Sequence, residues 1–577
     1  MEMKRFHNIL SLLTLGPLAL KSCRLSLSHI ALGPLALAGL LSLSACADLL
    51  DLPSSQYVTE EGHTLSQAAD TVYSVMGILG TVQKVADKVV LMGELRADLV
   101  DENEYTSTEL RQLVQNNVAA DNSLVNYSDF YAIINNCNYF LSRADTTVLV
   151  GGRRAMAKEF AVVTAVRAWT YMQLALIYGE VPFYTEPILT VADAEKDYPR
   201  YTLAQICDYF IPQLLPLTDT EQPTYGTIYG IPSAKFFFPV RLVLADMYLW
   251  QHDYEQAARM YATFLAKEQL TTGTQSAVVS GINANDELLG FTSTWLGTFN
   301  NPSGEEVISL IPMASTKLQG TKSELSNVFS STEENDYHYR IAPSAAYGEL
   351  CEAQDYAYVV NAKTTKHLTC GDMRRYAVFP ALFNEQQAQQ GRPSYKEEEK
   401  DRLINMKYQS GHVFVYRTGT VWLRLAEALN CLGRSDEAFG ILKDGCSVRL
   451  VGDSLAFTFA NTTEALARFA GLHARGCGRS FGNDMYAIPD LTDSLTATQY
   501  TPAEVQQYVE DLIVDEMALE TAFEGHRFYD LMRVALRRDD PSYLASRVAR
   551  RKGAQEPADE SLRTLLSNPS HWYIHHE

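Results

Sequence analysis

The sequence predicts a mainly α-helical fold in which irregular helical hairpins carry one large loop-rich insertion with a few short strands. Apolar residues recur at three- and four-residue steps over long stretches, as between Ala157 and Tyr178. Short turns that contain an acidic residue separate successive helical stretches. Residues 271–405 lack this period and are rich in Gly, Ser, Thr, Asn and Tyr. With 577 residues, the chain is long enough to bury a large core.

The N-terminal segment has the layout of a bacterial lipoprotein signal. Basic residues precede an apolar segment that ends in Leu43-Ser44-Ala45-Cys46, with small residues just before the cysteine. We expect residues 1–45 to be a signal peptide and Cys46 to carry the lipid, because two or more acyl chains anchor a protein stably. The alternative is an uncleaved anchor, since residues 25–45 are long enough to span a bilayer. Residues 46–65 are polar and are interpreted as a tether.

The chain is strongly acidic, and its cysteines do not form a metal-binding pattern. Its 69 Asp+Glu and 48 Lys+Arg give a net charge of −21. Such a surface repels nucleic acid and anionic lipid, so both are excluded as partners of the body. The nine cysteines include no Cys-x-x-Cys pair and no Cys/His cluster with zinc spacing. One disulfide, such as Cys351 to Cys370 or Cys431 to Cys446, is left open.

Three stretches show how the helices are organised. The first runs from residue 157 to 178 and ends at Gly179. The second spans residues 242–265 and is divided by a turn at His252-Asp253. The third spans residues 422–442, with a break at Gly433 and an expected helix cap at Asp436. Helix, short turn and helix with paired small residues is the pattern of tetratricopeptide-like hairpins, although the units are unevenly spaced.

The helical scaffold is expected to form a single body, residues 66–577, that an insertion interrupts. The scaffold covers residues 66–270 and 406–577, and the insertion covers residues 271–405. Within the insertion, Val307-Ile308-Ser309-Leu310-Ile311 reads as a buried strand. An irregular insertion of this size on a rigid scaffold is where binding residues tend to lie.

Five motifs occur in a fixed order behind the lipoprotein signal. They are the run Asn135-Asn136-Cys137-Asn138, the turn Tyr178-Gly179-Glu180-Val181-Pro182, the element Gly371-Asp372-Met373-Arg374, the helix centred on Arg424-Leu425-Ala426-Glu427-Ala428, and Phe523-Glu524-Gly525-His526-Arg527 within residues 516–533. On these motifs the chain resembles the SusD/RagB family of outer-membrane nutrient-binding lipoproteins of the Bacteroidota. The resemblance covers nearly all of the chain after Cys46, and only the C-terminal tail departs from it.

The resemblance implies a lipid-anchored protein of the outer membrane, exposed at the cell surface. Such a protein captures oligosaccharide or glycan nutrients and delivers them to a SusC-like, TonB-dependent transporter barrel. It performs no catalysis and needs no cofactor. An alternative is the same scaffold capturing oligopeptides, as some relatives do. A secreted glycoside hydrolase is a further alternative, which would need two carboxylates at a fixed separation in a cleft.

A cluster of acidic residues near the C-terminus raises the question of catalysis. Glu516, Glu520 and Glu524 are four residues apart, so a helix places them on one face, and His526 and Asp530 follow. An acid–base site is one interpretation. The favoured one is structural, with Arg527 and Arg533 pairing with these carboxylates. The sequence shows no Gly-rich phosphate loop, Ser-centred elbow or His-Glu-x-x-His motif, so we expect a protein that is not an enzyme.

Ligand contacts in the family come from the loop after the first helices and from the insertion. Sugar binding uses flat aromatic faces together with polar groups that hydrogen-bond the hydroxyls. The candidates in these two regions are Trp295, Phe299, Tyr337, Tyr339, Tyr105 and Asp101. For Trp295, a local core role is the alternative.

Charged residues in the same regions have simpler interpretations. Arg96 and Asp98 are interpreted as a structural ion pair. The acidic runs at residues 101–104 and 333–336 could supply oxygen ligands to calcium, but neither has EF-hand spacing. We therefore expect solvated loops there and no metal.

Overall fold

The structure is a computed structural model of the chain. It describes residues 68–150, 152–282, 287–361, 364–367, 370–389, 402–460, 469–477 and 486–575. The predicted signal peptide, the lipidation site at Cys46 and the tether lie outside the described residues. The elements below belong to the unit that spans Leu65–Glu577.

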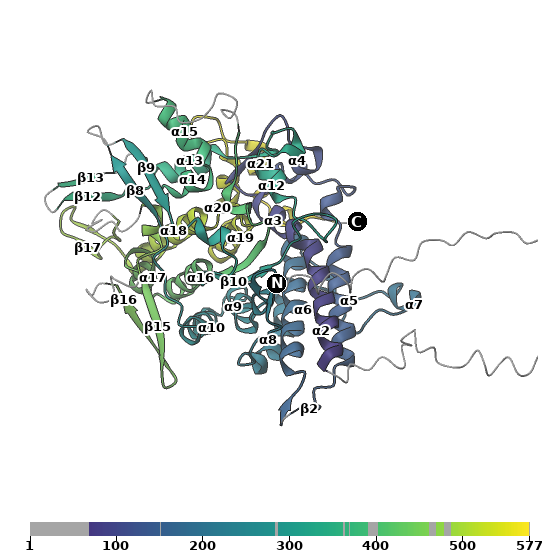
Figure 1. Cartoon of the computed structure of the whole chain (residues 1–577). Helices are drawn as coiled ribbons and strands as arrows, with labels where there is room; N and C mark the ends of the chain where they lie inside the picture. Colours follow the sequence, from purple (N-terminus) through teal and green to yellow (C-terminus); the bar gives the residue numbers. More distant parts are fainter. Residues whose placement is uncertain are drawn as a thin grey trace, which may run out of the picture. The chain divides into compact units, whose positions relative to one another are not determined.

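The N-terminal part of the scaffold contains α2 (Ala68–Val82), α3 (Ala86–Glu94), α4 (Thr108–Val114), α5 (Ser128–Arg143), α6 (Ala157–Tyr178), the short α7 (Val191–Ala194) and α8 (Leu203–Leu214). Of these, α2, α5, α6 and α8 pack side by side, as the purple and blue ribbons in Figure 1 show. Helix α6 has the predicted bounds and stops at Gly179, where φ is +78°. Among the described helices, only α6 has the length and composition of a membrane span, but 94% of its apolar window is buried inside the protein. It is therefore the central core helix of this layer.

Two helical hairpins continue the scaffold. They are formed by α9 (Val240–Trp250) with α10 (Tyr254–Lys267), and by α16 (Thr418–Cys431) with α17 (Ser435–Lys443). Asp253 caps α10 by accepting a hydrogen bond from the backbone N–H of Gln256, as the acidic turn predicts. The cap predicted at Asp436 is wrong. Helix α17 already begins at Ser435, so Asp436 lies in its first turn. There the negative charge of Asp436 interacts favourably with the positive end of the helix dipole.

Four helices complete the C-terminal part of the scaffold. They are α18 (Pro502–Thr521), α19 (Arg527–Arg538), α20 (Ser542–Ala549) and α21 (Glu560–Leu566). A capping box between Thr501 and Glu504 starts α18. Helix α18 packs against α16 and α17, and its buried face joins the same hydrophobic core as α6 and α9. The scaffold thus has one continuous core.

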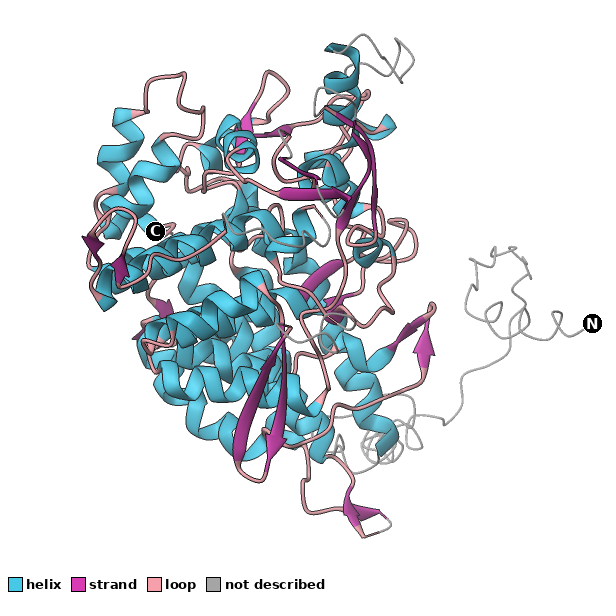
Figure 2. Cartoon of the chain, turned by 90° about the vertical axis from the view of Figure 1, so that its left-hand side faces the viewer, coloured by secondary structure: helices cyan, strands magenta, loops and turns pink. Residues whose placement is uncertain are grey.

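The strands of the described chain form small two-stranded antiparallel ribbons, drawn in magenta in Figure 2. The longer pairs are β1 (Val100–Glu102) with β11 (Ile341–Pro343), β8 (Ala277–Ile282) with β9 (Leu288–Ser293), β10 (Val307–Ile311) with β14 (Val413–Arg417), β12 (Ala357–Asn361) with β13 (Thr364–His367), and β15 (Cys446–Val451) with β16 (Ser454–Phe459). The predicted strand over residues 307–311 is confirmed as β10. Short pairs are β2 (Leu149–Val150) with β3 (Arg153–Arg154), β4 (Val181–Pro182) with β5 (Arg200–Tyr201), β6 (Thr227–Ile228) with β7 (Ile231–Pro232), and β17 (Thr492–Asp493) with β18 (Thr498–Gln499).

Short helices lie between these ribbons. They are α11 (Gly297–Asn300), α12 (Leu325–Phe329), α13 (Ala345–Glu352), α14 (Arg374–Val378) and α15 (Pro380–Gln389). The 3₁₀ turns are η2 (Gln83–Val85), η3 (Ser123–Val125), η4 (Leu215–Leu217), η5 (Ser233–Phe236), η6 (Glu333–Asn335), η8 (Met406–Tyr408), η10 (His473–Gly476) and η11 (Pro569–Trp572). The mainly α-helical fold of irregular hairpins, with short strands and loops in the insertion, is confirmed.

The seven cysteines of the described chain are free thiols. Neither bridge that the sequence left open is formed, whether Cys351 to Cys370 or Cys431 to Cys446. Burial raises the pKa of Cys431 and Cys446 to about 12, so these thiols stay neutral and pack as small apolar groups.

One close approach of two backbones explains a glycine in the Phe-Glu-Gly-His-Arg motif. Gly525 follows α18 with φ at +85° and lies against Gly93 of α3. A Cβ on Gly93 would lie 1.8 Å from the carbonyl oxygen of Gly525. Any larger residue would push α3 away from this turn, since backbone cannot move aside as a side chain can.

Candidate functional site

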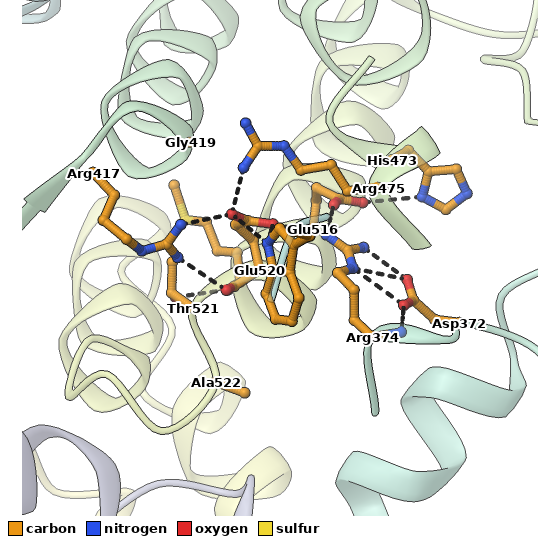
Figure 3. Close-up of polar contacts among 12 residues, drawn as sticks. Asp372, Arg374, Arg417, Gly419, His473, Arg475, Glu516, Glu520, Thr521 and Ala522 are labelled. Carbon is orange, nitrogen blue, oxygen red and sulfur yellow. Dashed lines mark hydrogen bonds and ion pairs between the residues drawn. The ribbon is translucent and has the colours of Figure 1, made fainter. Parts of the chain in front are cut away.

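The carboxylates singled out in the sequence lie in a buried charge network. Helix α18 contributes Glu516 and Glu520, and Glu524 follows it in the next turn. All three side chains are almost fully buried. Figure 3 shows Glu516 and Glu520 between guanidinium groups that come from other parts of the chain.

Glu520 is the centre of this network. Its Oε1 accepts hydrogen bonds from Arg417 at 2.9 Å and from Arg475 at 2.8 Å, and its Oε2 accepts one from Arg374 at 3.1 Å. The indole N–H of Trp295 donates to the same carboxylate at 3.0 Å. A Cβ on residue 419, a glycine, would lie 2.8 Å from Glu520 Oε1, so that position has no room for a side chain.

The neighbouring carboxylates are equally well paired. Arg374 donates to Glu516 at 2.7 Å, and the other Glu516 oxygen lies 3.0 Å from His473 Nδ1. Glu524 accepts from Arg417 at 2.7 Å and from Lys407 at 2.6 Å. The network therefore ties α18 to the α14 and η8 segments, to β14 and to η10.

The predicted partners of these carboxylates are corrected. Arg527 pairs with Asp98 at 2.7 Å, so Arg96 does not form the predicted ion pair with Asp98. Arg96 instead lies over the Phe528 ring at 4.2 Å from its centroid. Arg533 pairs with Glu427 at 2.6 Å and, among the predicted carboxylates, with Asp530 at 2.8 Å. The carboxylates of α18 pair instead with Arg374, Arg417 and Arg475.

The electrostatics of the network favour fixed charges over proton transfer. Burial by itself would raise the pKa of Glu520. The combined attraction of the Arg475, Arg417 and Arg374 guanidinium groups is larger, so the pKa of Glu520 lies below its ordinary value. His526 is half-buried, and desolvation with the nearby Arg424 lowers its pKa to about 3. General acid–base catalysis works best with a pKa near the operating pH and with access to substrate. The lowered pKa values of Glu520 and His526 do not meet the first condition.

Two of the predicted ligand residues belong to the core. Trp295 has no exposed surface, and Phe299 is 1% exposed. The two rings contact edge to face, and Lys407 lies 5.0 Å above the Trp295 ring. A sugar ring needs an exposed aromatic face, so Trp295 and Phe299 are wrong as stacking residues. For Trp295 the core alternative holds, because its indole N–H is used by Glu520.

The other four candidates are brought to one place by the β1–β11 ribbon. Asp101 of β1 pairs with Ala342 of β11. The chain that follows β1 is held to the chain that precedes β11, since Asn103 donates from its side chain to the Tyr339 carbonyl at 2.9 Å. Tyr105, Tyr337 and Tyr339 therefore lie near Asp101, although more than two hundred residues separate the two segments.

The aromatic rings at this ribbon are exposed and stacked. Tyr105 is 46% exposed and stacks on His338, with ring centroids 3.7 Å apart. Tyr337 is 45% exposed, has φ at +62°, and carries the Arg402 guanidinium 4.2 Å above its ring. A bulky residue at positive φ is uncommon. We call this surface the tyrosine patch: Asp101, Tyr105, Tyr337, His338, Tyr339 and Arg402.

Two members of the patch were not predicted from sequence. His338 lies between two predicted tyrosines, and its aromatic character was the available signal. Arg402 belongs to a charged stretch at the end of the insertion, and nothing local indicates that it contacts Tyr337. Its place depends on the return of the chain toward β14.

The acidic runs considered for calcium carry other contacts. Glu102 accepts from Arg111 at 2.9 Å, and Glu334 pairs with Lys322 and accepts from Asn327 at 2.7 Å. Within the part of the chain that the structure describes, no group of three or more His, Cys, Asp or Glu residues could hold a metal ion. The carboxylates of the two runs therefore pair with separate partners and do not converge on one point.

Comparison with known proteins identifies relatives along nearly the whole chain. The family model described as the SusD family matches residues 486–566, which include α18, α19 and the Phe-Glu-Gly-His-Arg motif. SusD-like protein P38 of Formosa agariphila is 20% identical over 519 residues, covering 85% of this chain and 88% of that protein. SusD-like protein P2 of the same organism is 22% identical over 524 residues, covering 86% and 89%.

Solved structures show the same fold. A SusD homolog from Bacteroides thetaiotaomicron superposes with a TM-score of 0.54 at 16% identity, covering 88% of this chain and 94% of that one. A SusD-like carbohydrate binding protein from Bacteroides vulgatus gives a TM-score of 0.50 at 15% identity, covering 82% and 84%. The family model over residues 486–566, the two curated relatives and the ordered motifs together show that this chain is similar to the SusD family.

Proposed function

We propose that this protein is a cell-surface lipoprotein that binds oligosaccharide nutrients without altering them and delivers them to a TonB-dependent transporter of the outer membrane. The observation that carries the binding role is the tyrosine patch. It combines exposed tyrosine rings with a carboxylate and a guanidinium group, which is the chemistry that pyranose rings and their hydroxyls require. The carbohydrate-binding description of one structural neighbour supports the same ligand class.

The state of the buried charge network supports binding without catalysis. Glu516, Glu520 and Glu524, on α18 and in the turn after it, are each bonded to arginine, lysine or histidine away from solvent. At the tyrosine patch, the Glu104 carboxylate is hydrogen-bonded to Tyr105, whereas a glycosidase needs two carboxylates placed across one glycosidic bond. The patch therefore fits a site that holds a sugar chain.

Binding is tested with the purified protein on an array of neutral and acidic oligosaccharides, followed by calorimetry. We expect saturable binding of at least one neutral class and no release of reducing ends. Accumulation of reducing ends with protein concentration would favour a glycoside hydrolase. Peptides co-purifying with the protein, with no sugar bound, would favour the oligopeptide alternative.

Anchoring and delivery need their own tests in cells. Globomycin blocks lipoprotein signal cleavage, and we expect it to cause accumulation of the precursor and Cys46→Ser to release the protein from the membrane fraction. Affinity purification from membranes is expected to recover a TonB-dependent barrel with the wild type. Unchanged processing and a soluble wild-type protein would contradict the anchor, and a purified complex without a barrel would contradict delivery.

A further inference from the structure

A second concave region lies apart from the residues of the tyrosine patch. It is a cavity of about 820 Å³, within the ~300–1,000 Å³ typical of small-molecule sites. Helix α2, the β6–β7 turn, residues 312–334 and residues 408–412 contribute to its wall. Met76, Phe236 and Met313 supply apolar surface, and Gln83, Asn327 and Thr332 supply amide and hydroxyl groups. We call it the Tyr229 cavity, after the residue in its wall that is discussed below.

Two polar groups of the wall have hydrogen-bonding capacity that the described residues do not use. The Ser410 hydroxyl is buried and has no hydrogen-bond partner among the described residues. Nδ1 of His412 accepts the backbone N–H of Met313 at 3.1 Å, and desolvation lowers the His412 pKa. A neutral ring with an accepting Nδ1 carries its proton on Nε2, so His412 keeps one donor. An unsatisfied buried hydroxyl normally indicates a missing partner.

The turn beside this cavity presents an aromatic ring to solvent. Tyr229 is 99% exposed and lines the cavity together with Ile228 and Ile231. Its φ is +50° and that of Gly230 is +82°, which is the pattern of a turn that favours Asn-Gly. A tyrosine at the first of these positions is sterically unfavourable, and an exposed ring gains nothing from packing. Ser303 holds the turn by donating to the Gly230 carbonyl at 2.7 Å.

The charges around the cavity select among ligand classes. Lys322 is already paired with Glu334, and Asn327 donates to the same carboxylate. The acidic Glu333 also lines the wall, so an anionic ligand would meet repulsion. The wall combines hydroxyl, amide and imidazole groups with an apolar floor and one free aromatic ring. This combination fits a neutral saccharide, which has many hydroxyls and apolar ring faces.

We propose that the Tyr229 cavity is a second binding site for neutral saccharides, distinct from the tyrosine patch. The ring of Tyr229 stacks on one sugar residue, while Ser410 and His412 bond its hydroxyls. The backbone N–H of Tyr337 donates to the Thr332 carbonyl, so one short segment runs from the cavity wall to the tyrosine patch. This inference rests on the proposed carbohydrate-binding function and adds a second site to it.

The test uses neutral trisaccharides of glucose, mannose and xylose as probes, with calorimetry and saturation-transfer NMR on the purified protein. We expect two binding events with the saccharide that binds. Tyr229→Ala removes the exposed ring, and Ser326→Trp fills the cavity from α12; each should weaken one event at least tenfold and leave the other intact. Tyr105→Ala should affect only the other event. The matched control for Tyr105→Ala is Tyr508→Ala, because Tyr508 on α18 is 44% exposed and Tyr105 is 46% exposed. This control should change neither binding event. Thermal unfolding of each variant verifies its fold.

The outcomes separate the two proposals. A single event that Tyr105→Ala removes, and that neither Tyr229→Ala nor Ser326→Trp changes, would overturn the second site and leave the proposed function standing. An event lost only in Tyr229→Ala and Ser326→Trp would support the cavity and overturn the tyrosine patch as a site. No binding of any probe would overturn both.

Discussion

The buried charge network and the tyrosine patch are built from similar residue types with opposite results. At Glu520, three arginines and one indole saturate a carboxylate that has no contact with solvent. At the tyrosine patch, Tyr105 and Tyr337 are each nearly half exposed, and an arginine lies over one of the rings. The first arrangement joins segments of the chain. The second leaves aromatic surface for a partner from outside.

This difference shows that burial, and not residue type, separates the structural cluster from the proposed binding surface. An arginine beside an aromatic ring occurs in both regions, since Arg417 lies 5.0 Å above the buried Phe299 ring. A buried ion pair is expensive to desolvate, so its groups must be completely paired. An exposed cation–π contact holds little energy and can reorganise around a ligand.

The largest effect is expected from breaking the centre of the network. Glu520→Ala leaves the guanidinium groups of Arg374, Arg417 and Arg475 buried without their shared carboxylate. Removing one partner of a buried pair costs about 3–5 kcal/mol, so the free energy of unfolding should fall by that amount in urea titrations. The exposed Glu268→Ala is the control and should change it by less than about 0.5 kcal/mol. Equal stability of the two variants would show that the network does not hold the fold.

A pH series tests a second buried carboxylate in the same way. Burial by itself would raise the pKa of Glu427. The attraction of Arg533 and Arg537 is larger and lowers this pKa to about 2 from its ordinary 4.5. Because the folded pKa is depressed, this group stabilises the fold above pH 4.5, and the contribution is lost as the pH falls toward 2. We expect a loss of about 3 kcal/mol across this window.

Glu427→Gln removes the titrating group and gives the comparison. The difference in unfolding free energy between wild type and variant should be largest above pH 4.5 and should shrink with acid. A difference that stays constant across this window would mean that the Glu427 pKa is not depressed.

Trp295→Phe separates the core role of this residue from ligand binding. The substitution removes the N–H that Glu520 accepts and keeps an aromatic ring, so the unfolding free energy should fall by about 1–3 kcal/mol. Oligosaccharide affinity should stay within twofold of wild type in calorimetry. A large loss of affinity at unchanged stability would return Trp295 to the binding site.

Tyr105→Ala is expected to have the smallest effect on stability and, unlike Trp295→Phe, to weaken oligosaccharide binding. The ring is half exposed, so the unfolding free energy should change by less than about 0.5 kcal/mol. The affinity for the bound oligosaccharide should fall by about five- to tenfold, since an aromatic contact contributes on the order of 1 kcal/mol. Unaltered affinity would remove Tyr105 from the site.

Local pattern was sufficient for the helices but not for the environment of single residues. The period over residues 157–178 predicted α6 with its exact bounds, because a long amphipathic or buried stretch repeats its signal at every turn. For Trp295, local pattern left a stacking role and a core role open, because the surrounding Gly, Thr and Asn residues indicate a loop. That loop instead brings the indole against α18, where a buried carboxylate accepts its N–H.

The sequence by itself determined the helical scaffold, the strand at residues 307–311, the resemblance to the SusD/RagB family and four of the six members of the tyrosine patch. Only the tertiary structure decided that Asp101 and Tyr105 meet Tyr337 and Tyr339, and that Arg374, Arg417 and Arg475 take Glu520. Periodicity and capping depend on neighbours within a few residues, so they can be read along the chain. The partners of a charge or a ring lie on segments that are 45 to more than two hundred residues apart, and packing alone brings these together.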